Sequence, residues 1–458
     1  MILAVDCGST NLKAALYDSA LNRLAAHSVP VEYSRRDAVR AEFEAERLWS
    51  AFLALINAVV HQAGCTTAAI SQVALGSQAQ SFCLLDSAGQ ALMPFISWMD
   101  TRAEEESALL TQAFGRDFHR HSSFSSPFSS LEISKLLWVR RHLPQVWAHT
   151  RHLVSVPGFF CLRLAGVNPM DSNLAAMNGL VSMVTGDWWR ELLDYGGVPG
   201  DWLPTLAPAG HGWRGRFQAP GWPDADVTLV LAGNDHTAGA LGNGCRPGEI
   251  IVTFGTALVA YRRTGAEPGP YHPDGCWGPY PGGGYYELAV CNHGCSALDW
   301  ARSILLPEQP PSSFVDLAAT AGPGSGGVRF YPERARTESA WLGNGTPADR
   351  ARAVLEGILF ALRRLLADNM NTWPVSGVCA LGGGVKSQYW MQMAADILGC
   401  PVRTGAGDSL LGAAALAANR NENLKIQAGD ARMPDPARCA QYESIFVNWK
   451  KTNPAGTS

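Results

Sequence analysis

A hairpin pattern that occurs twice, half a chain apart, constrains this sequence more than any other feature. Residues 1–17 alternate as a strand, a Gly-Ser-Thr turn and a second strand, and the stretch from Ile250 to Tyr261 reads in the same way. Three positions correspond at a constant offset of 247, with Asp6, Gly8 and Ser9 matching Thr253, Gly255 and Thr256. Either hairpin alone would be an ordinary turn, but the repeat predicts two similarly folded domains that each contribute a turn to a shared cleft.

Length and composition agree with two globular α/β domains. The chain has 458 residues, of which 47% are hydrophobic and only 17% charged. A formal charge of -4 without a basic block excludes an electrostatic footprint for nucleic acid or an anionic membrane, so a small neutral substrate fits better. No apolar run reaches the 18 or so residues that a spanning helix needs. We expect a cytoplasmic protein whose 11 cysteines are reduced thiols.

The residues between the hairpins predict a boundary near the middle of the chain. Gly210 to Asp226 is rich in Gly, Pro and Trp and lacks periodicity, so we expect an N-terminal domain at 1–226 and a C-terminal domain at 227–458. Helical periodicity marks the residues 46–60, 134–142, 350–370 and 387–398. Strand character marks 73–85, 227–232 and 379–381. The last 30 or so residues carry little signal, and 453–458 should be frayed.

The strand at 227–232 places Asp235 where α/β proteins expose functional groups. Phosphoryl transfer needs phosphate cradles, a carboxylate that organises a metal ion, and a group that orients the attacking hydroxyl. The two turns can supply the cradles, Asp6 can order Mg2+ through water, and Asp235 can accept the hydroxyl proton. The competing interpretation of Asp235 is a helix N-cap. The glycines at 382–384 would let a nucleotide lie against backbone at the mouth of a helix.

These motifs, in this order, resemble the FGGY family of carbohydrate kinases, which belongs to the actin and hexokinase superfamily. The resemblance covers nearly the whole chain and implies two actin-like (ribonuclease H-like) domains with a cleft between them. It implies ATP-phosphate contacts at Gly8, Ser9, Thr10, Lys13, Thr253, Gly255 and Thr256, and adenosine contacts at Gly382, Gly383, Gly384 and Ser387. By the same similarity Asp235 is the catalytic aspartate, and Asp6 and Asp235 serve Mg2+ through water.

The resemblance also implies a sugar pocket in the N-terminal domain. Its contacts would be Gln78, Gln80, Trp98, Asp100, Asp235 and His236. Two of them have a plainer interpretation: Trp98 as a core residue, and Asp100 as an ion-pair partner of Arg102 or of the nearby glutamates. His236 would be a pocket wall or a substrate contact. Lys13 is either a phosphate contact or an exposed strand lysine.

Some residues depart from the family pattern. Ala79 and Gln80 stand where glycerol kinases carry Arg-Glu and xylulose kinases usually Met-His, and the 331–337 stretch matches the family only in part. The sequence thus predicts an ATP- and Mg2+-dependent kinase of a small sugar or polyol, with ketopentoses and short polyols favoured by motifs nearest to pentulose kinases. The alternatives are a catalytically silent nucleotide or sugar sensor and an actin-like filament or chaperone ATPase. A homodimer remains open.

Overall fold

Both predicted hairpins form, and their boundaries repeat the offset seen in the sequence. In the computed structural model, β1 (Ile2–Cys7) pairs antiparallel with β2 (Asn11–Tyr17) across a three-residue turn. The second hairpin joins β16 (Glu249–Phe254) to β17 (Leu258–Thr264) across a turn of the same length. Every boundary of the second hairpin lies 247 positions after its counterpart in the first. The internal repeat is therefore structural.

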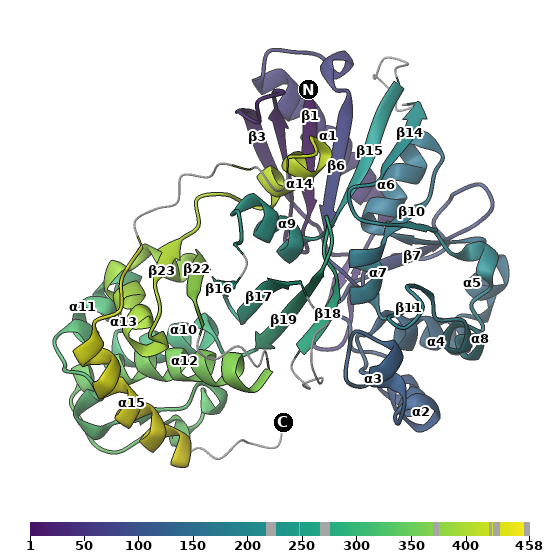
Figure 1. The fold of residues 1–458 in the computed structure, drawn as a ribbon. Coiled ribbons are helices and arrows are strands. Elements are labelled where there is room, and N and C mark those ends of the chain that lie inside the picture. The colour runs from purple at the N-terminus through teal and green to yellow at the C-terminus, as the bar shows by residue number, and fades with distance from the viewer. Residues whose placement is uncertain are drawn as a thin grey trace. The chain divides into compact units, whose positions relative to one another are not determined.

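The structure describes residues 1–216, 226–246, 248–265, 275–369, 375–420, 424 and 431–452 (Figure 1). By their contacts the residues fall into two units. The first unit comprises Met1–Gly244, Gly265–Tyr286 and Gly407–Lys425, and the second comprises Cys245–Thr264, Glu287–Ala406 and Ile426–Ser458. Among the described residues, no helix is both long enough and apolar enough to span a membrane.

The first unit is organised by a six-stranded sheet in the order β14-β15-β6-β1-β2-β3. Its strands, besides β1 and β2, are β3 (Arg23–Pro30), β6 (Gln72–Ser77), β14 (Gly212–Arg216) and β15 (Asp226–Asn234). β1, β6 and β15 run parallel, and most of their residues are buried, as expected for strands covered on both faces. One covering helix is α1 (Ala45–Gln62), whose Leu48, Phe52 and Ile56 share the sheet's apolar core.

A second sheet of the first unit has the order β4-β5-β8-β7-β9. Its strands are β4 (Arg35–Arg36), β5 (Ala41–Phe43), β7 (Phe82–Leu85), β8 (Phe95–Ile96) and β9 (His152–Ser155). The remaining strands of the unit are β10 (Pro169–Asp171), β11 (Val181–Ser182), β12 (Asp187–Trp188), β13 (Thr205–Ala207) and β18 (Gly275–Pro279). Its remaining helices are α2 (Glu104–Phe114), α3 (Phe118–His121), α4 (Glu132–His142), α5 (Pro144–His149), α6 (Val156–Ala165), α7 (Ser172–Asn178), α8 (Arg190–Gly196), α9 (Asp235–Gly242) and α14 (Ser409–Ala417).

In the second unit, β16 lies between its hairpin partner β17 and the parallel strand β22 (Gly377–Gly382), and β23 (Val402–Thr404) pairs with β22. The long helix α12 (Pro347–Asn369) supplies Val354, Leu355, Ile358 and Leu362 to the unit's core. The unit's other elements are α10 (Cys295–Leu305), α11 (Pro311–Ala319), β20 (Arg329–Phe330), β21 (Trp341–Leu342), α13 (Gln388–Leu398) and α15 (Pro436–Lys451). β19 (Tyr285–Cys291) begins at the end of one unit's range and continues into the other's.

The division of the chain differs from the expected boundary between 226 and 227. β15 pairs in parallel with β6, so this strand and the following α9 belong to the first unit. α14, from far down the chain, also joins the first unit, where it packs on α9, β1 and β6. The boundary was expected from the Gly, Pro and Trp content of 210–226, within which 212–216 form β14, whereas the unit is set by strand pairing that the local sequence does not reveal.

Two other expectations have mixed outcomes. The predicted helices at 46–60, 134–142, 350–370 and 387–398 are confirmed by α1, α4, α12 and α13, apart from Met370, which lies outside the described residues. The C-terminal stretch holds α15, capped by Asp435, whose carboxylate accepts from the N–H groups of Ala437 and Arg438. Sequence reasoning missed this helix, which buries only Tyr442, Phe446 and Trp449. Residues 453–458 lie outside the described part.

The contact between α9 and α14 depends on glycine. A Cβ at Gly412 would stand 1.8 Å from the carbonyl oxygen of Ala238, and one at Gly242 would stand 1.8 Å from that of Asp408. Because those atoms are backbone, they cannot rotate away. The two helices therefore approach more closely than any side chain at these positions would allow.

We predict that Gly412→Ala lowers the free energy of unfolding by about 1–3 kcal/mol through overpacking. Gly239→Ala is the matched control in α9, because a Cβ there meets nothing within 4 Å. Alanine's better helix propensity should make this control neutral or stabilising by up to about 1 kcal/mol. Thermal unfolding of the two variants beside the wild type measures the difference. Equal melting temperatures for the two variants would contradict the packing argument.

Candidate functional site

Three parallel strands bring the predicted residues of the first unit to one edge. Cys7 at the end of β1 is in register with Ser77 at the end of β6, and Ser77 is in register with Asn234 at the end of β15. The segments that follow these strands begin with Gly8, Gln78 and Asp235. Carboxyl ends of parallel strands are where α/β proteins place ligands, so the register itself assembles this candidate site.

Asp6 is the most unusual ionisable group at this edge. Its carboxylate is 5% exposed, and its Oδ2 accepts a 2.7 Å hydrogen bond from the Ser409 hydroxyl and lies 3.5 Å from the Lys13 ammonium. Its Oδ1 is buried and has no hydrogen-bond partner among the described residues. Burial, followed by the negative charge of Asp235, raises the pKa of Asp6 above its ordinary value. Two carboxylates near each other, one with an unpaired oxygen, favour a bound cation.

Asp235 is the first residue of α9, and the competing N-cap role belongs to its neighbour. The Asn234 side chain caps the helix by accepting from the His236 N–H at 2.9 Å. Asp235 Oδ1 accepts from the same N–H, and the residue is half-buried. A residue of α7 holds the backbone before Asp235 in place, because Asn173 Oδ1 accepts a hydrogen bond from Asn234 N at 2.9 Å. His236 is also half-buried and lies beside Asp235 in the same turn.

The segment after β6 is held mainly through its backbone. Gln80 has a φ of +58°, in the left-handed region that few side chains adopt. Its N–H donates to Asn178 Oδ1 at 2.7 Å, its amide Nε2 donates to Met177 O at 3.0 Å, and its carbonyl accepts from Lys135 Nζ at 2.7 Å. Gln78 is buried, and its Oε1 accepts from the Ser81 hydroxyl. Gln80 is thus the more accessible of the two predicted glutamines.

The segment after β8 carries two predicted sugar contacts, Trp98 and Asp100, whose surroundings differ. Trp98 is 44% exposed, which argues against the core interpretation, and its N–H donates to Ser81 Oγ. Asp100 is 0% exposed, and its two oxygens accept from the Arg102 guanidinium and from Ala41 N at 2.8 Å. Arg102 also pairs with Glu42 at 2.5 Å. The structure therefore supports the ion-pair interpretation of Asp100 and corrects the expectation that its carboxylate accepts sugar hydroxyls.

The first turn combines close backbone approach with accessible hydroxyls. A Cβ at Gly8 would stand 2.9 Å from Asn11 O, so the turn requires glycine there. Ser9 is half-buried and Thr10 is exposed, and Tyr33 donates its hydroxyl to Ser9 O at 2.9 Å. Lys13 is exposed, with its ammonium directed to Asp6, so it joins the site through that carboxylate.

The second turn lies beside the start of a helix. Gly255 O and Thr256 O accept from the N–H groups of Cys295 and Ser296 in the first turn of α10. Gly294, just before this helix, has no room for a Cβ, which would meet Ala257 at 2.7 Å. Thr256 is exposed and Thr253 is half-buried. The second unit thus presents a backbone turn and a hydroxyl as the first unit does.

The glycine loop of the second unit follows directly beside this turn, because Phe254 is in register with Gly382. Gly382 has a φ of +91°, and Gly384 is wedged between Phe254 and the Trp390 ring. Gly383 differs, since a Cβ there would meet nothing within 4 Å and its backbone is exposed. Ser387 caps α13 by accepting from Trp390 N at 3.1 Å. Gly383 is therefore the open point of the loop.

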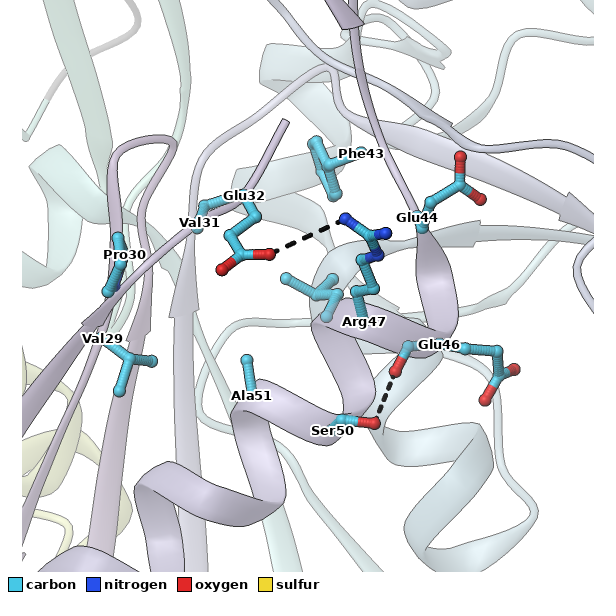
Figure 2. A pocket seen from close by; sticks show the side chains of 11 residues that line it. Val29, Pro30, Val31, Glu32, Phe43, Glu44, Glu46, Arg47, Ser50 and Ala51 are labelled. Carbon is cyan, nitrogen blue, oxygen red and sulfur yellow. Dashed lines mark hydrogen bonds and ion pairs between the residues drawn. The ribbon is translucent and has the colours of Figure 1, made fainter. Parts of the chain in front are cut away.

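A pocket of about 490 Å3 lies between the end of β3 and the start of α1 (Figure 2), and its lining residue Val31 donates its N–H to Thr10 O of the first turn at 2.9 Å. Glu32 and Arg47 line it and approach each other to 3.8 Å, and Phe43 forms part of its apolar wall. None of the predicted site residues lines it. Within the described part of the chain, no group of three or more His, Cys, Asp or Glu side chains could hold a metal ion.

Sequence reasoning missed the residues that support this edge. Ser409 reaches Asp6 from a helix about 400 residues away, and Asn173, Asn178 and Lys135 fix the backbone around Asp235 and Gln80. Asn173, Asn178 and Lys135 are buried polar residues in helices without a motif around them. The hydrogen bonds that they and Ser409 make could be found only from the fold.

Comparison with known proteins agrees with this arrangement. The N-terminal domain model of the FGGY family of carbohydrate kinases matches residues 1–242, and the C-terminal domain model matches residues 250–420. The chain is 29% identical to a xylulose kinase of Klebsiella pneumoniae, covering 96% of both proteins. It is 30% identical to a glycerol kinase of Gloeobacter violaceus, covering 88% of this chain and 84% of the relative.

A crystal structure of gluconate kinase from Lactobacillus acidophilus superposes with a TM-score of 0.89 at 23% identity, covering 99% of this chain and 97% of that one. This likeness confirms the two-domain actin/hexokinase-like fold. The matched models cover both halves, including both hairpins and the glycine loop. The chain belongs to the FGGY family of carbohydrate kinases.

Proposed function

We propose that this chain transfers the γ-phosphoryl group of ATP to a hydroxyl of a pentulose or a related small polyol, with Asp235 as the group that orients and deprotonates that hydroxyl. The observation that carries the proposal is the register of β1, β6 and β15, which sets Asp235 beside Asp6 and the segment of Gln80. A half-buried carboxylate at a helix start, next to a second carboxylate, suits a base that works beside a metal-bound phosphate.

The acceptor would bind against Gln80, Trp98 and His236. The indole of Trp98 offers an exposed apolar wall, and the Gln80 amide is oriented by the hydrogen bond that its Nε2 donates to Met177 O. Rings and carbon faces of sugars pack on such walls while polar groups fix the orientation. Asp100 stays outside this proposed set, because its oxygens are already used by Arg102 and Ala41.

Magnesium fits the carboxylates at this edge. The buried Oδ1 of Asp6 has no hydrogen-bond partner among the described residues and could bind a cation or a cation-bound water. Asp235 lies close enough to raise the pKa of Asp6. Bound there, Mg2+ would neutralise charge on the phosphate oxygens. Asp6 would hold its water shell, and the Ser409 hydroxyl would keep the Asp6 carboxylate in place.

The nucleotide contacts would come from both turns and the glycine loop. Ser9 and Thr10 of the first unit, and Gly255 and Thr256 of the second, would donate hydroxyl or N–H groups to phosphate oxygens. Gly383 would allow the adenosine to approach the backbone, because nothing occupies the space where its side chain would be. Ser387, which already caps α13, would lie at the start of the helix beside that loop.

Relatives named for xylulose and for glycerol are about equally similar to this chain, so overall identity does not choose the acceptor. The identity of the pocket residue Gln80 should influence the choice of acceptor more than overall identity does, because one substituted contact can redirect specificity. A pentulose remains the favoured class. Nothing in the comparisons favours the non-catalytic sensor considered from the sequence.

A panel of acceptors tests the function. With Mg2+ and ATP, release of ADP is followed in the presence of D-xylulose, D-ribulose, L-ribulose, pentitols, aldonates and glycerol. We expect one acceptor, or a small group of closely related ones, to stimulate ADP release well above the rate without acceptor. ADP release that does not depend on any acceptor would instead support an ATPase.

Asp235→Asn should lower kcat with the accepted sugar by about 10²- to 10⁴-fold, because the amide cannot take the hydroxyl proton. The asparagine oxygen can still accept from the His236 N–H, so the start of α9 and ATP affinity should be preserved. Calorimetric titration with ATP checks the second point. Asp201→Asn, an exposed aspartate of the same unit, is the control for the substitution itself. A kcat within threefold of wild type would exclude Asp235 as the base.

Asp6→Asn should stabilise the unliganded protein at neutral pH while lowering turnover by about 10- to 100-fold. Burial raises the pKa of Asp6, so the folded state penalises its ionised form at pH values above the folded-state pKa. This penalty shrinks as the pH falls below the folded-state pKa and disappears below the ordinary value of 3.8, where Asp6 is protonated in both states. The gain in melting temperature should therefore shrink on acidification. A loss of melting temperature at neutral pH with normal turnover would contradict this view.

A further inference from the structure

A buried lysine connects the two segments that carry the proposed sugar contacts. Lys135, in α4, is 0% exposed, and its ammonium donates to Gln80 O at 2.7 Å and to Ser97 O at 2.9 Å. The first carbonyl belongs to the segment after β6, and the second immediately precedes Trp98. No motif in the sequence marks Lys135, and the proposed chemistry does not use it.

The two segments are also joined directly, beside the bridge that Lys135 makes. Trp98 N donates to Ser81 Oγ at 3.0 Å, and Ser81 Oγ donates to Gln78 Oε1 at 2.9 Å. Gln80, with its φ of +58°, lies in the sequence between Gln78 and Ser81. A conformation that side chains rarely adopt persists only where the surroundings hold it, and Lys135 supplies one of the hydrogen bonds that do so.

The surroundings of Lys135 make its buried amine unfavourable for stability, because both Lys135 and the neighbouring Glu132 are removed from water. Glu132, one turn earlier in α4, is 1% exposed, and neither of its carboxylate oxygens has a hydrogen-bond partner among the described residues. Burial raises the pKa of Glu132 and lowers that of Lys135. The charge of Asp100 raises the pKa of Lys135 and the charge of Arg102 lowers it. The Phe82 ring lies 5.8 Å from the amine. An apolar side chain would fill this space without these penalties.

We propose that Lys135 is a positioning residue of the sugar pocket, which sets the separation and orientation of Gln80 and Trp98 by bridging the carbonyls of Gln80 and Ser97. Charged or neutral, the amine has enough hydrogens for both bonds. Glu132 acts through Lys135 as its buried counter-group. This inference rests on the proposed function for the meaning of the pocket, but the bridge itself can be tested without turnover.

The test uses Lys135→Met, which keeps a long unbranched side chain but removes the hydrogen bonds to Gln80 O and Ser97 O. We expect backbone amides of 78–81 and 97–102 to exchange hydrogen for deuterium faster than in the wild type, with exchange in the β16–β17 hairpin unchanged. With D-xylulose as the probe, KM for the sugar should rise about tenfold or more while KM for ATP stays the same. If D-xylulose is not turned over by the wild type, the panel sugar that is accepted replaces it.

Two further variants separate positioning from general stability. Arg140→Met changes an exposed cation of the same helix and should leave exchange and both KM values as in the wild type. Glu132→Gln keeps the two donor bonds of Lys135 and should leave the sugar KM within about threefold of wild type, whatever its effect on melting temperature. If Lys135→Met does not fold, Lys135→Gln, which retains amide donors on a shorter side chain, replaces it and should show the same split in KM.

A lower melting temperature in Lys135→Met or Lys135→Gln with unchanged sugar KM and unchanged local exchange would overturn the proposal, because a purely structural lysine predicts that pattern. Equal increases in KM for sugar and for ATP would overturn it too. If no sugar is phosphorylated by the wild type but exchange increases locally in the variant, the bridge stands and the proposed function fails.

Discussion

Parallel pairing of β6 with β1 on one side and with β15 on the other is the constraint on which the first unit depends. Cys7, Ser77 and Asn234 finish at the same edge, and the pairing of β15 with β6 reaches Asn234 through a register shift between Leu231 and Asn234. The residues that follow them come from positions separated by about 70 and 160 residues in the chain. A shift of register by one residue would turn every buried side chain of β6 to the opposite face, so packing on both faces secures the site.

Two carboxylates of the first unit differ in how completely they are hydrogen-bonded. Asp6 is buried near Asp235 and has one oxygen without a partner among the described residues, whereas both oxygens of Asp100 accept from Arg102 or a backbone N–H. The contrast separates function from structure: a carboxylate whose hydrogen bonds are complete stabilises the fold, and one with an unused oxygen beside a like charge is prepared for a cation. The same reasoning distinguishes Gly383, which has open space around it, from Gly382 and Gly384, which the packing of Phe254 requires.

The sequence predicted those features that depend on local pattern or on repetition. The two hairpins, their offset, Asp235 at a strand end and the long helix α12 all follow from short-range periodicity. The boundary at 226 differed from the contact units, because the pairing of β15 with β6 and the packing of α14 on α9 are long-range and involve glycines with no local signature. The function of Asp100 was misjudged for a related reason: only the fold shows that Arg102 and Ala41 N consume its oxygens. Ser409, Asn173 and Lys135 act through hydrogen bonds to residues distant in the sequence, which only the fold reveals.

The central claim is that the phosphoryl group reaches a sugar hydroxyl and not water, and phosphorus-31 NMR of the running reaction tests it most directly. The sample contains wild-type protein, Mg2+, ATP and the acceptor that stimulates ADP release. The account predicts that a phosphomonoester resonance grows at the rate at which the γ-phosphate resonance of ATP disappears, with little inorganic phosphate. Growth of inorganic phosphate alone, at the same rate with and without the sugar, would contradict it.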